Sequence, residues 1–389
     1  MCMACVSVAQ QLLSRFNKNR CILLVILHKN KYLIYIMEGS YWMRIAIIGC
    51  GAMGTILGAY MAKNGLNVEL VDTYKEHVDA LNESGARVTG LADFCAKVKA
   101  VTPEQMTGIY DLAIVLTKQN VNKIVLGHLK QFMDDNSFVC TLQNGVPEPY
   151  VAELIGKERT VGGATNWSAT FVGPGVSELT TKLEETEYLF EIGEIDGSTT
   201  PRIQKVAEAL GSMGTAHVTE TLMASRWGKL VFNAAISGLS AVCGCTFGEV
   251  TSDKFSRACG SYIAREVKKC CEAEGYVLPP LGGKMPMDSL ELKDQAMFDL
   301  NQRIWHMVGG MLKDGKASML QDLEKGLVTE VREINGHVSK IGKEFGIPTP
   351  FNDKVVEIVT RIEKGEITYS MDNLQYFDKS LIEYNLLEI

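Results

Sequence analysis

Short apolar runs alternate with longer amphipathic segments through the first half of the chain. Four of these runs are of strand length; they lie at residues 45–48, 68–71, 111–116 and 137–142, and the first is continuous. Runs of this kind are typical of parallel strands that are covered on both faces. The segments between them, at 56–63, 75–84 and 121–132, have the period of helices. This alternation predicts an α/β fold with a Rossmann-type parallel sheet.

The alternation continues to about residue 195 and then stops. We expect a strand near 96–101 and another at 161–166, and the segment 169–195, with Gly173-Pro174-Gly175 at its centre, predicts an antiparallel hairpin that closes the sheet. From residue 220 onward the pattern is almost entirely helical. The prediction is therefore a dinucleotide-binding domain at 43–217, followed by an all-helical substrate and catalytic domain at 218–389.

A glycine motif directly follows the first apolar run. Gly49, Gly51 and Gly54 form G-x-G-x-x-G, with Ala52 and Met53 at the start of the next helix. In a dinucleotide site these glycines permit a tight turn, close approach of a pyrophosphate and close packing of helix on strand. The motif alone is weak, but here a strand precedes it and a helix follows. The sequence therefore predicts a nucleotide-binding loop.

Asp72 ends the second apolar run, about 20 positions beyond the glycines, where an acidic residue binds the ribose hydroxyls. A carboxylate there would repel a 2'-phosphate, so of the two cofactors NADH and NADPH we expect NADH to be preferred. Lys75 lies close enough in sequence to offset part of this repulsion.

Polar residues follow two further strands. Lys118 comes after the run at 111–116, and Asn144 after the run at 137–142. The carboxyl ends of parallel strands border the crevice in which open α/β sheets bind ligands, so both are candidate cofactor contacts. Asn144-Gly145 also favours a turn for purely local reasons, and that alternative stays open.

Lys229, Asn233 and Ser237 recur at every fourth residue in an otherwise apolar helical segment, and so predict one polar stripe. A buried lysine needs a partner, and Glu330, on a helix expected at 318–343, is a candidate. Ser318 with Gln321 fits a capping box at the start of that helix, and equally fits a ligand contact.

The composition and charge of the chain limit the classes of function that it can have. The chain has 389 residues and a net charge of −7, without a long basic run, so we expect a small-molecule partner and no nucleic acid. Eleven cysteines without a framework spacing indicate reduced thiols and a cytoplasmic protein. Cys2-x-x-Cys5 has no second ligand pair nearby, so we expect no metal site there.

The first 42 residues differ from the rest. An apolar run at 21–27 is interrupted by His28-Lys-Asn-Lys31, so neither half is long enough to cross a membrane. Basic residues ahead of that run imitate a signal peptide, but no small-residue cleavage site follows. We expect an extension of doubtful relevance, with Met43 as the functional start.

From Met43 to its end the chain resembles the ketopantoate reductase (2-dehydropantoate 2-reductase) family. The resemblance rests on motifs that occur in the family's order: Gly49/Gly51/Gly54, Lys118, Gln143-Asn144-Gly145, Lys229 with Asn233, Ser318-Met-Leu-Gln-Asp322, Thr329-Glu330 and Asn335-Gly336. It implies hydride transfer from a nicotinamide cofactor to the 2-keto group of ketopantoate, which gives D-pantoate on the route to pantothenate and coenzyme A.

Family roles then fall on matching residues. The resemblance implies that Lys229 is the general acid and that Glu330 holds the substrate hydroxyl, tunes that lysine and borders the cofactor. It implies that Asn233 and Ser318 bind substrate, and that Lys118 and Asn144 line the cleft near nicotinamide and substrate. Ser237 stands where the family usually has a second asparagine; it remains a substrate-binding candidate and makes the substrate's identity less secure.

Other interpretations stay open. The substrate could be another branched 2-oxo acid, a 2-hydroxy acid or a polyol phosphate, although a phosphate would call for more Lys or Arg in the cleft. A non-catalytic nucleotide-sensing module would keep the glycines without needing Lys229 and Glu330. The helical second domain could support a homodimer, and the segment at 281–315 has no functional account.

Overall fold

The computed structural model describes residues 21–28, 31–38, 43–280 and 286–389. Contacts divide the chain into two units, 1–44 and 45–389. In the first, β1 (Cys21–His28) pairs antiparallel with β2 (Lys31–Glu38). The two apolar runs of the expected extension are thus strands, whereas Cys2 and Cys5 lie outside the described residues. No helix in the described ranges is long and apolar enough to cross a membrane.

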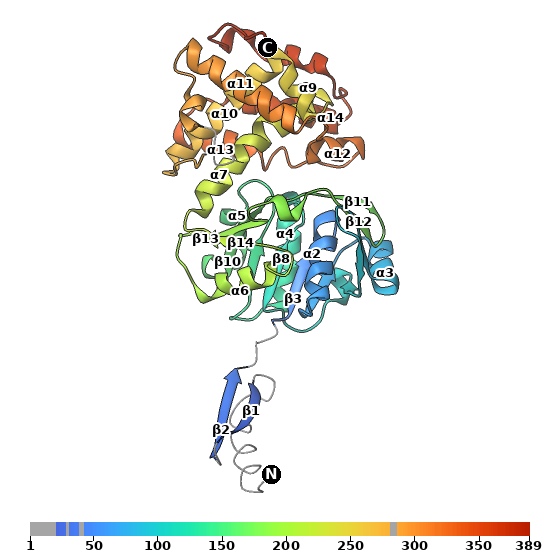
Figure 1. Cartoon of the computed structure of the whole chain (residues 1–389). Coiled ribbons are helices and arrows are strands. Elements are labelled where there is room, and N and C mark those ends of the chain that lie inside the picture. Colours follow the sequence, from blue (N-terminus) through green and yellow to red (C-terminus); the bar gives the residue numbers. More distant parts are fainter. Residues whose placement is uncertain (1–20, 29–30, 39–42, 281–285) are drawn as a thin grey trace. The chain divides into compact units, whose positions relative to one another are not determined.

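The second unit is built on an eight-stranded sheet with the order β14-β13-β10-β9-β8-β3-β4-β7 (Figure 1). The strands are β3 (Ile45–Ile48), β4 (Val68–Val71), β7 (Lys99–Val101), β8 (Leu112–Val115), β9 (Phe138–Thr141), β10 (Thr160–Thr165), β13 (Phe190–Glu194) and β14 (Ala216–Val218). All neighbours are parallel except β10 and β13. Every residue of β3, β4, β8 and β9 is buried, as their apolar runs predict. The Rossmann-type sheet is confirmed.

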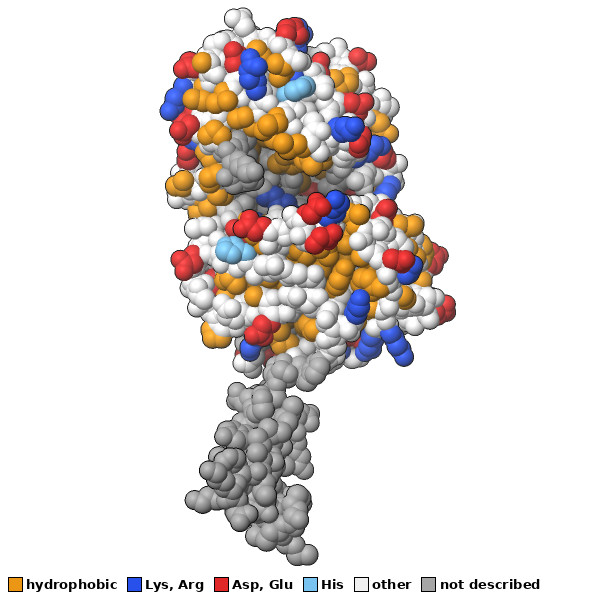
Figure 2. All heavy atoms as spheres, viewed as in Figure 1, with side chains coloured by type: hydrophobic (Ala, Val, Ile, Leu, Met, Phe, Trp, Pro, Cys, Tyr) orange, Lys and Arg blue, Asp and Glu red, His pale blue; other side chains and the backbone are white. Residues whose placement is uncertain are grey.

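Helices between the strands cover this sheet: α2 (Ala52–Lys63), α3 (Lys75–Ser84), α4 (Asn122–Leu129), α5 (Glu148–Ile155) and α6 (Pro201–Leu210). Helix α2 starts directly after the glycine loop and buries Ile56 and Leu57 completely. The helix expected at 121–132 is shorter, because 3₁₀ turns occupy Gln119–Val121 and Lys130–Phe132 on either side of α4. Figure 2 shows acidic and basic side chains interspersed over the described residues of the face that it draws.

The predicted hairpin forms but does not close the main sheet. Strands β11 (Ala169–Gly173) and β12 (Val176–Leu179) pair antiparallel and belong to a separate sheet, β11-β12-β5-β6, with β5 (Ala86–Gly90) and β6 (Phe94–Ala96). The place beside β10 is taken by β13, and β12 instead pairs parallel with β5. The expectation was wrong on this point, because a hairpin pattern does not say which strand the hairpin will join.

After β14 the described chain is helical, as predicted. The helices are α7 (Leu222–Phe232), α8 (Gly238–Cys243), α9 (Phe247–Ser252), α10 (Lys254–Ala273), α11 (Gln295–Met311), α12 (Ser318–Glu324), α13 (Asn335–Phe345) and α14 (Pro350–Glu363). They enclose one apolar core, in which the indoles of Trp227 and Trp305 are the largest buried side chains. Helix α10, at its centre, packs against α7, α11, α13 and α14.

Two helical expectations need correction. The single helix predicted at 318–343 is two helices, α12 and α13, because Gly326 adopts a φ of +67° just after α12 and turns the chain. Glu330 therefore lies in the loop between the helices. The segment 281–315 contains α11, while its residues 281–285 are outside the described part.

Candidate active site

The glycine loop joins β3 to α2 and has no room for larger residues at Gly49 and Gly54. Gly49 has a φ of +93°, and a Cβ there would lie 2.8 Å from the Thr117 backbone nitrogen. A Cβ at Gly54 would lie 2.3 Å from the Gly49 carbonyl oxygen, whereas one at Gly51 would meet open space. Two of the glycines thus shape the turn, and the third leaves a free approach to the backbone. This cradle fits the pyrophosphate of a dinucleotide.

A cavity of about 300 Å³ adjoins this loop and reaches the ends of β3, β4 and β8. Asp72 lines it, and its carboxylate accepts the Cys50 N–H (2.7 Å) and the Tyr74 N–H (2.9 Å). Glu104 adds a second carboxylate to a lining that, among the described residues, contains no lysine or arginine. Lys75 instead pairs with Asp79 on the surface, 2.5 Å away. Ala52 and Met53, the first residues of α2, are half-buried beside the loop.

Lys229 lines a second, larger cavity of about 730 Å³. Its Nζ donates to the carbonyl oxygen of Thr165 at the end of β10, at 2.7 Å, and also lies 3.4 Å from the Thr165 hydroxyl. Burial, assisted by the neighbouring positive charge of Arg226, lowers the pKa of Lys229 to about 7. An ammonium with that pKa exchanges its proton readily near neutral pH.

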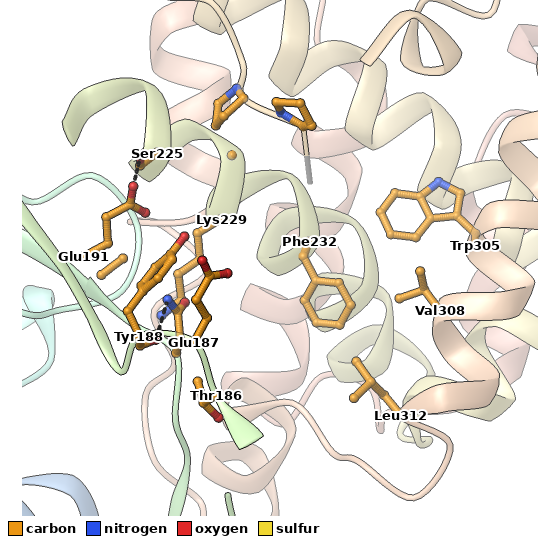
Figure 3. A pocket seen from close by; sticks show the side chains of 15 residues that line it. Thr186, Glu187, Tyr188, Glu191, Ser225, Lys229, Phe232, Trp305, Val308 and Leu312 are labelled. Atoms are coloured by element: carbon orange, nitrogen blue, oxygen red, sulfur yellow. Dashed lines mark hydrogen bonds between the residues drawn. The ribbon is translucent and has the colours of Figure 1, made fainter. Parts of the chain in front are cut away.

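The walls of this cavity differ in character (Figure 3). Phe232 of α7 faces Trp305, Val308 and Leu312, which belong to α11 or directly follow it, and these side chains form an apolar wall. On the other side Glu187, Tyr188 and Glu191 lie with Lys229, and Ser225 donates to Glu191 at 2.8 Å. None of these wall residues was predicted from the sequence. The apolar period of α11 could indicate a packed helix, but not that its end borders a cavity.

A separate group of contacts joins the helical region to the carboxyl end of β8. Lys118 forms an ion pair with Asp322, and a carboxylate oxygen of Glu330 accepts the Gln119 N–H at 3.0 Å. Burial raises the pKa of Glu330 to about 7. The structure thus brings Lys118 and Glu330 together, but Glu330 is bonded to Gln119, and Lys229 to Thr165, so the expected Lys229–Glu330 pair is not formed.

The predicted polar stripe is interrupted. Residues Asn233–Ser237 form a π-helical turn between α7 and α8. Asn233 still follows Lys229 by one α-turn, since its N–H donates to the Lys229 carbonyl oxygen. Because a π-turn holds more residues than an α-turn, Ser237 does not continue this face. Neither belongs to the lining of the larger cavity; Asn233 is half-buried and Ser237 buried. Turns of this kind occur frequently at functional sites.

Two other candidates lie near the same helical region. Asn144 is half-buried, and its carbonyl oxygen accepts a hydrogen bond from the Gln119 side chain. The next residue, Gly145, has a φ of +77°, as the turn alternative predicts. Ser318 is exposed and is the first residue of α12, not its cap; Ala317 is the cap residue and offers no side-chain hydrogen bond. The capping-box prediction was therefore wrong.

Arg226, which was not predicted as a site residue, is completely buried one turn before Lys229. Its guanidinium donates to Glu148 (2.6 Å) and to the carbonyl oxygens of Gln143 (2.8 Å) and Thr141 (3.1 Å). Burial raises the pKa of Glu148, and Arg226 opposes this. These bonds attach α7 to the end of β9. The sequence signal that could have indicated this residue is an arginine within an otherwise apolar helical segment.

A dinucleotide cradle in the sheet, combined with a helical region that carries a half-buried lysine of lowered pKa, is typical of a nicotinamide-dependent oxidoreductase. The chain belongs to the ketopantoate reductase family: residues 45–192 match the family model "Ketopantoate reductase PanE/ApbA", and residues 221–363 match the model of its C-terminal domain.

Individual relatives agree with this assignment. The 2-dehydropantoate 2-reductase of Archaeoglobus fulgidus is 30% identical over 326 residues, which cover 83% of this chain and 98% of that protein. Among solved structures, 2-dehydropantoate 2-reductase from Geobacter metallireducens is similar with a TM-score of 0.68 and 25% identity, over 82% of this chain and 99% of that one. A complex of D-mandelate dehydrogenase with NADH has the same TM-score and identity, over 83% and 99%.

Proposed function

We propose that this protein reduces the 2-keto group of ketopantoate to D-pantoate with a nicotinamide cofactor, a step on the route to pantothenate and coenzyme A. The observation that carries the proposal is Lys229, a half-buried lysine in a cavity, whose pKa is lowered to about 7. Reduction of a ketone places negative charge on its oxygen, and a positioned ammonium stabilises and then protonates that oxygen. When bound, the nicotinamide supplies the hydride.

The remaining residues would position the reactants. The Thr165 carbonyl oxygen holds the Lys229 ammonium by accepting a hydrogen bond from it. Glu330, whose pKa of about 7 allows either protonation state, would accept or donate a hydrogen bond to a substrate hydroxyl and border the cofactor. We assign substrate contacts to Asn233, Ser237, Ser318 and Asn144, and cofactor contacts to Asn144, Lys118 and the glycine loop with Ala52 and Met53.

We further propose a preference for NADH over NADPH. Both acidic side chains in the lining of the smaller cavity, Asp72 and Glu104, would repel a 2'-phosphate. Lys75 is engaged with Asp79. Asp72 also accepts hydrogen bonds from two backbone N–H groups near the loop, so its replacement would weaken the binding of both cofactors. The ratio of their affinities, and not either affinity alone, therefore tests its role.

A second candidate is a 2-oxo acid with a larger apolar side chain. The cavity beside Lys229 is about 730 Å³, well above what the few carbon atoms of ketopantoate occupy. Phe232, Trp305 and Leu312 would cover an apolar group, while Glu187 and Glu191 opposite them would disfavour a second carboxylate. This favours monocarboxylic substrates over dicarboxylic ones.

A substrate panel tests both candidates. NADH and NADPH oxidation would be measured with ketopantoate, 2-oxoisovalerate, benzoylformate, pyruvate and 2-oxoglutarate. The proposal expects turnover with ketopantoate, higher kcat/KM with NADH, and the lowest values with 2-oxoglutarate. A higher kcat/KM with benzoylformate would select the larger apolar substrate. Binding of cofactor without turnover of any acid would instead favour a nucleotide-sensing protein and contradict the proposal. Size-exclusion chromatography with light scattering would test the homodimer.

A further inference from the structure

His77 lies behind the glycine loop and is almost completely buried, with 1% of its surface exposed. It belongs to the first turn of α3, and its ring packs edge-on against Phe171 of β11, with ring centres 5.1 Å apart. It does not line either of the two cavities described above. A buried imidazole in this place calls for an explanation, because both of its nitrogens need hydrogen-bond partners.

The hydrogen bonds of His77 define its protonation state. The Gly175 N–H, at the turn between β11 and β12, donates to Nδ1 at 2.9 Å. An N–H group can only donate, so Nδ1 carries no proton. Nε2 therefore carries the proton of a neutral ring, and it lies 2.8 Å from the Cys50 carbonyl oxygen, to which it donates. The Thr55 hydroxyl donates to the same oxygen at 2.6 Å.

These contacts hold Cys50 from both sides of its backbone. Its carbonyl oxygen accepts from His77 and Thr55, and its N–H donates to Asp72 at 2.7 Å. The peptide between Cys50 and Gly51 is trans, so its C=O and N–H point in opposite directions. With the carbonyl held toward His77, the Gly51 N–H points away from it, and Gly51 is the exposed glycine whose Cβ position is open space.

We propose that His77 is a positioning residue for dinucleotide binding: it holds the Cys50 carbonyl inward so that the Gly51 N–H is presented to the cofactor pyrophosphate. The inference rests on the nicotinamide function proposed above. Backbone N–H groups at a helix N-terminus are the usual donors to phosphate, and they bind best when their direction is set in advance. Through Nδ1 the same ring also ties the loop to the β11–β12 turn.

The surroundings of His77 make this arrangement sensitive to acid. Burial lowers its pKa, while the Cys50 carbonyl and the carboxylate of Asp72 at the end of β4 oppose that shift. The neighbouring ring of Tyr74 lies with its centre 6.4 Å away, and the Cys50 thiol is un-ionised because burial raises its pKa. A proton added at Nδ1 would face the Gly175 N–H and remove its acceptor. We therefore expect cofactor affinity to fall with decreasing pH as His77 becomes protonated.

Two conservative variants separate the roles of the ring nitrogens. His77→Gln can place an amide N–H near the position of Nε2, so it can still donate to Cys50. His77→Asn can place an acceptor near Nδ1 but does not reach Cys50. In titrations of the full chain with NADH at pH 7.5, we expect Kd to rise about tenfold for His77→Asn and about threefold or less for His77→Gln, the scale of one hydrogen bond. The kcat at saturating NADH should stay within about twofold.

Controls and pH complete the test. His217→Asn, at an exposed position on β14, should leave Kd unchanged. The NADH Kd of the unmodified chain should rise between pH 7 and 5, and that of His77→Gln should rise less. Equal NADH affinity in all variants, or a loss that is the same for Gln and Asn, would overturn the inference. So would a pH profile unaffected by His77→Gln, which remains measurable even if His77→Asn does not fold. An unmodified chain that binds neither NADH nor NADPH would instead refute the proposed function itself.

Discussion

The glycine loop offers backbone groups to a ligand, whereas the cavity around Lys229 offers side chains. The loop is shaped and held by residues close in sequence or on adjoining strands, such as Asp72 and Thr117. The cavity takes its walls from distant parts of the chain: the end of β10, the start of β13 and the residues before it, helix α7, the prolines at 279–280, and helix α11 with Leu312 after it. From this comparison we expect cofactor binding and chemistry to be separable here. A change at the loop should impair cofactor binding, and a change at the cavity should impair turnover.

The strongest test of this separation is Lys229→Met. Removal of the ammonium should lower kcat with ketopantoate by roughly 10²-fold or more, the scale of general-acid catalysis, because nothing else described in the cavity can supply the proton as well. The Kd of NADH should stay within about twofold. Steady-state kinetics and NADH titration measure the two quantities. A parallel loss of NADH binding would show that lysine and loop are not separable.

The converse test changes the glycine loop and leaves the cavity unaltered, with the substitution Gly54→Ala. Its Cβ would lie 2.3 Å from the Gly49 carbonyl oxygen, so the loop must shift and NADH affinity should fall roughly 10- to 100-fold. Gly127→Ala on the exposed surface of α4 is the matched control, since a Cβ there meets nothing within 4 Å. It should leave affinity unchanged and slightly raise the free energy of unfolding. Unchanged binding in Gly54→Ala would disprove the fit of this loop.

The pH dependence of turnover sharpens the role of the cavity. A general acid must be protonated, and with a pKa of about 7 Lys229 loses its proton as pH rises through neutrality. The kcat/KM for ketone reduction should therefore be constant below that pKa and fall about tenfold per pH unit above it. Alcohol oxidation needs the neutral amine of Lys229 as base, so its kcat/KM should rise with pH and level off above the pKa. In Glu330→Gln the fall of kcat/KM with rising pH should remain. If this fall disappears, the titrating group is Glu330 and not Lys229.

The smallest expected effect concerns the apolar wall. Val308→Phe fills part of the cavity beside Trp305 and should raise KM for benzoylformate about tenfold, with little change for pyruvate. Met311→Phe is a control on the same helix, since Met311 is 73% exposed and does not line the cavity. Equal effects of Val308→Phe on the two acids would mean that the substrate side chain lies elsewhere.

The same contrast explains how far the sequence could be interpreted. Strands 45–48, 68–71 and 111–116 were predictable because their apolar runs and the glycines between them are local signals. The break in the helix expected at 318–343 was harder to predict, because an isolated Gly326 is compatible with a helix until the tertiary contacts are known. The cavity walls could not be predicted, since Glu187, Phe232 and Trp305 share no local pattern and only the fold brings them to one place.

The candidate site residues also divide into those with a local sequence signal and those whose contacts arise only from the fold. Lys229 stood out as a charged residue in an apolar helix, but its partner could not be inferred, because spacing does not reveal that the Thr165 carbonyl is within reach. The π-turn at Asn233–Ser237 could not be predicted either, because polar residues at every fourth position are also the pattern of a regular α-helix. His77 sits within a plain helical pattern, and its contacts with Cys50 and Gly175 arise only from the packing of three elements.

The buried pair of Arg226 and Glu148 has a consequence for how this protein can be divided. Both side chains are fully enclosed, and removal of one partner from such a pair typically costs about 3–5 kcal/mol because the other is left without its counter-charge. A fragment ending after β14 would contain Glu148 without Arg226. Separately expressed halves should therefore be poorly folded alone and recover order on mixing, because the N-terminal half needs Arg226 and the C-terminal half needs Glu148 as a counter-charge.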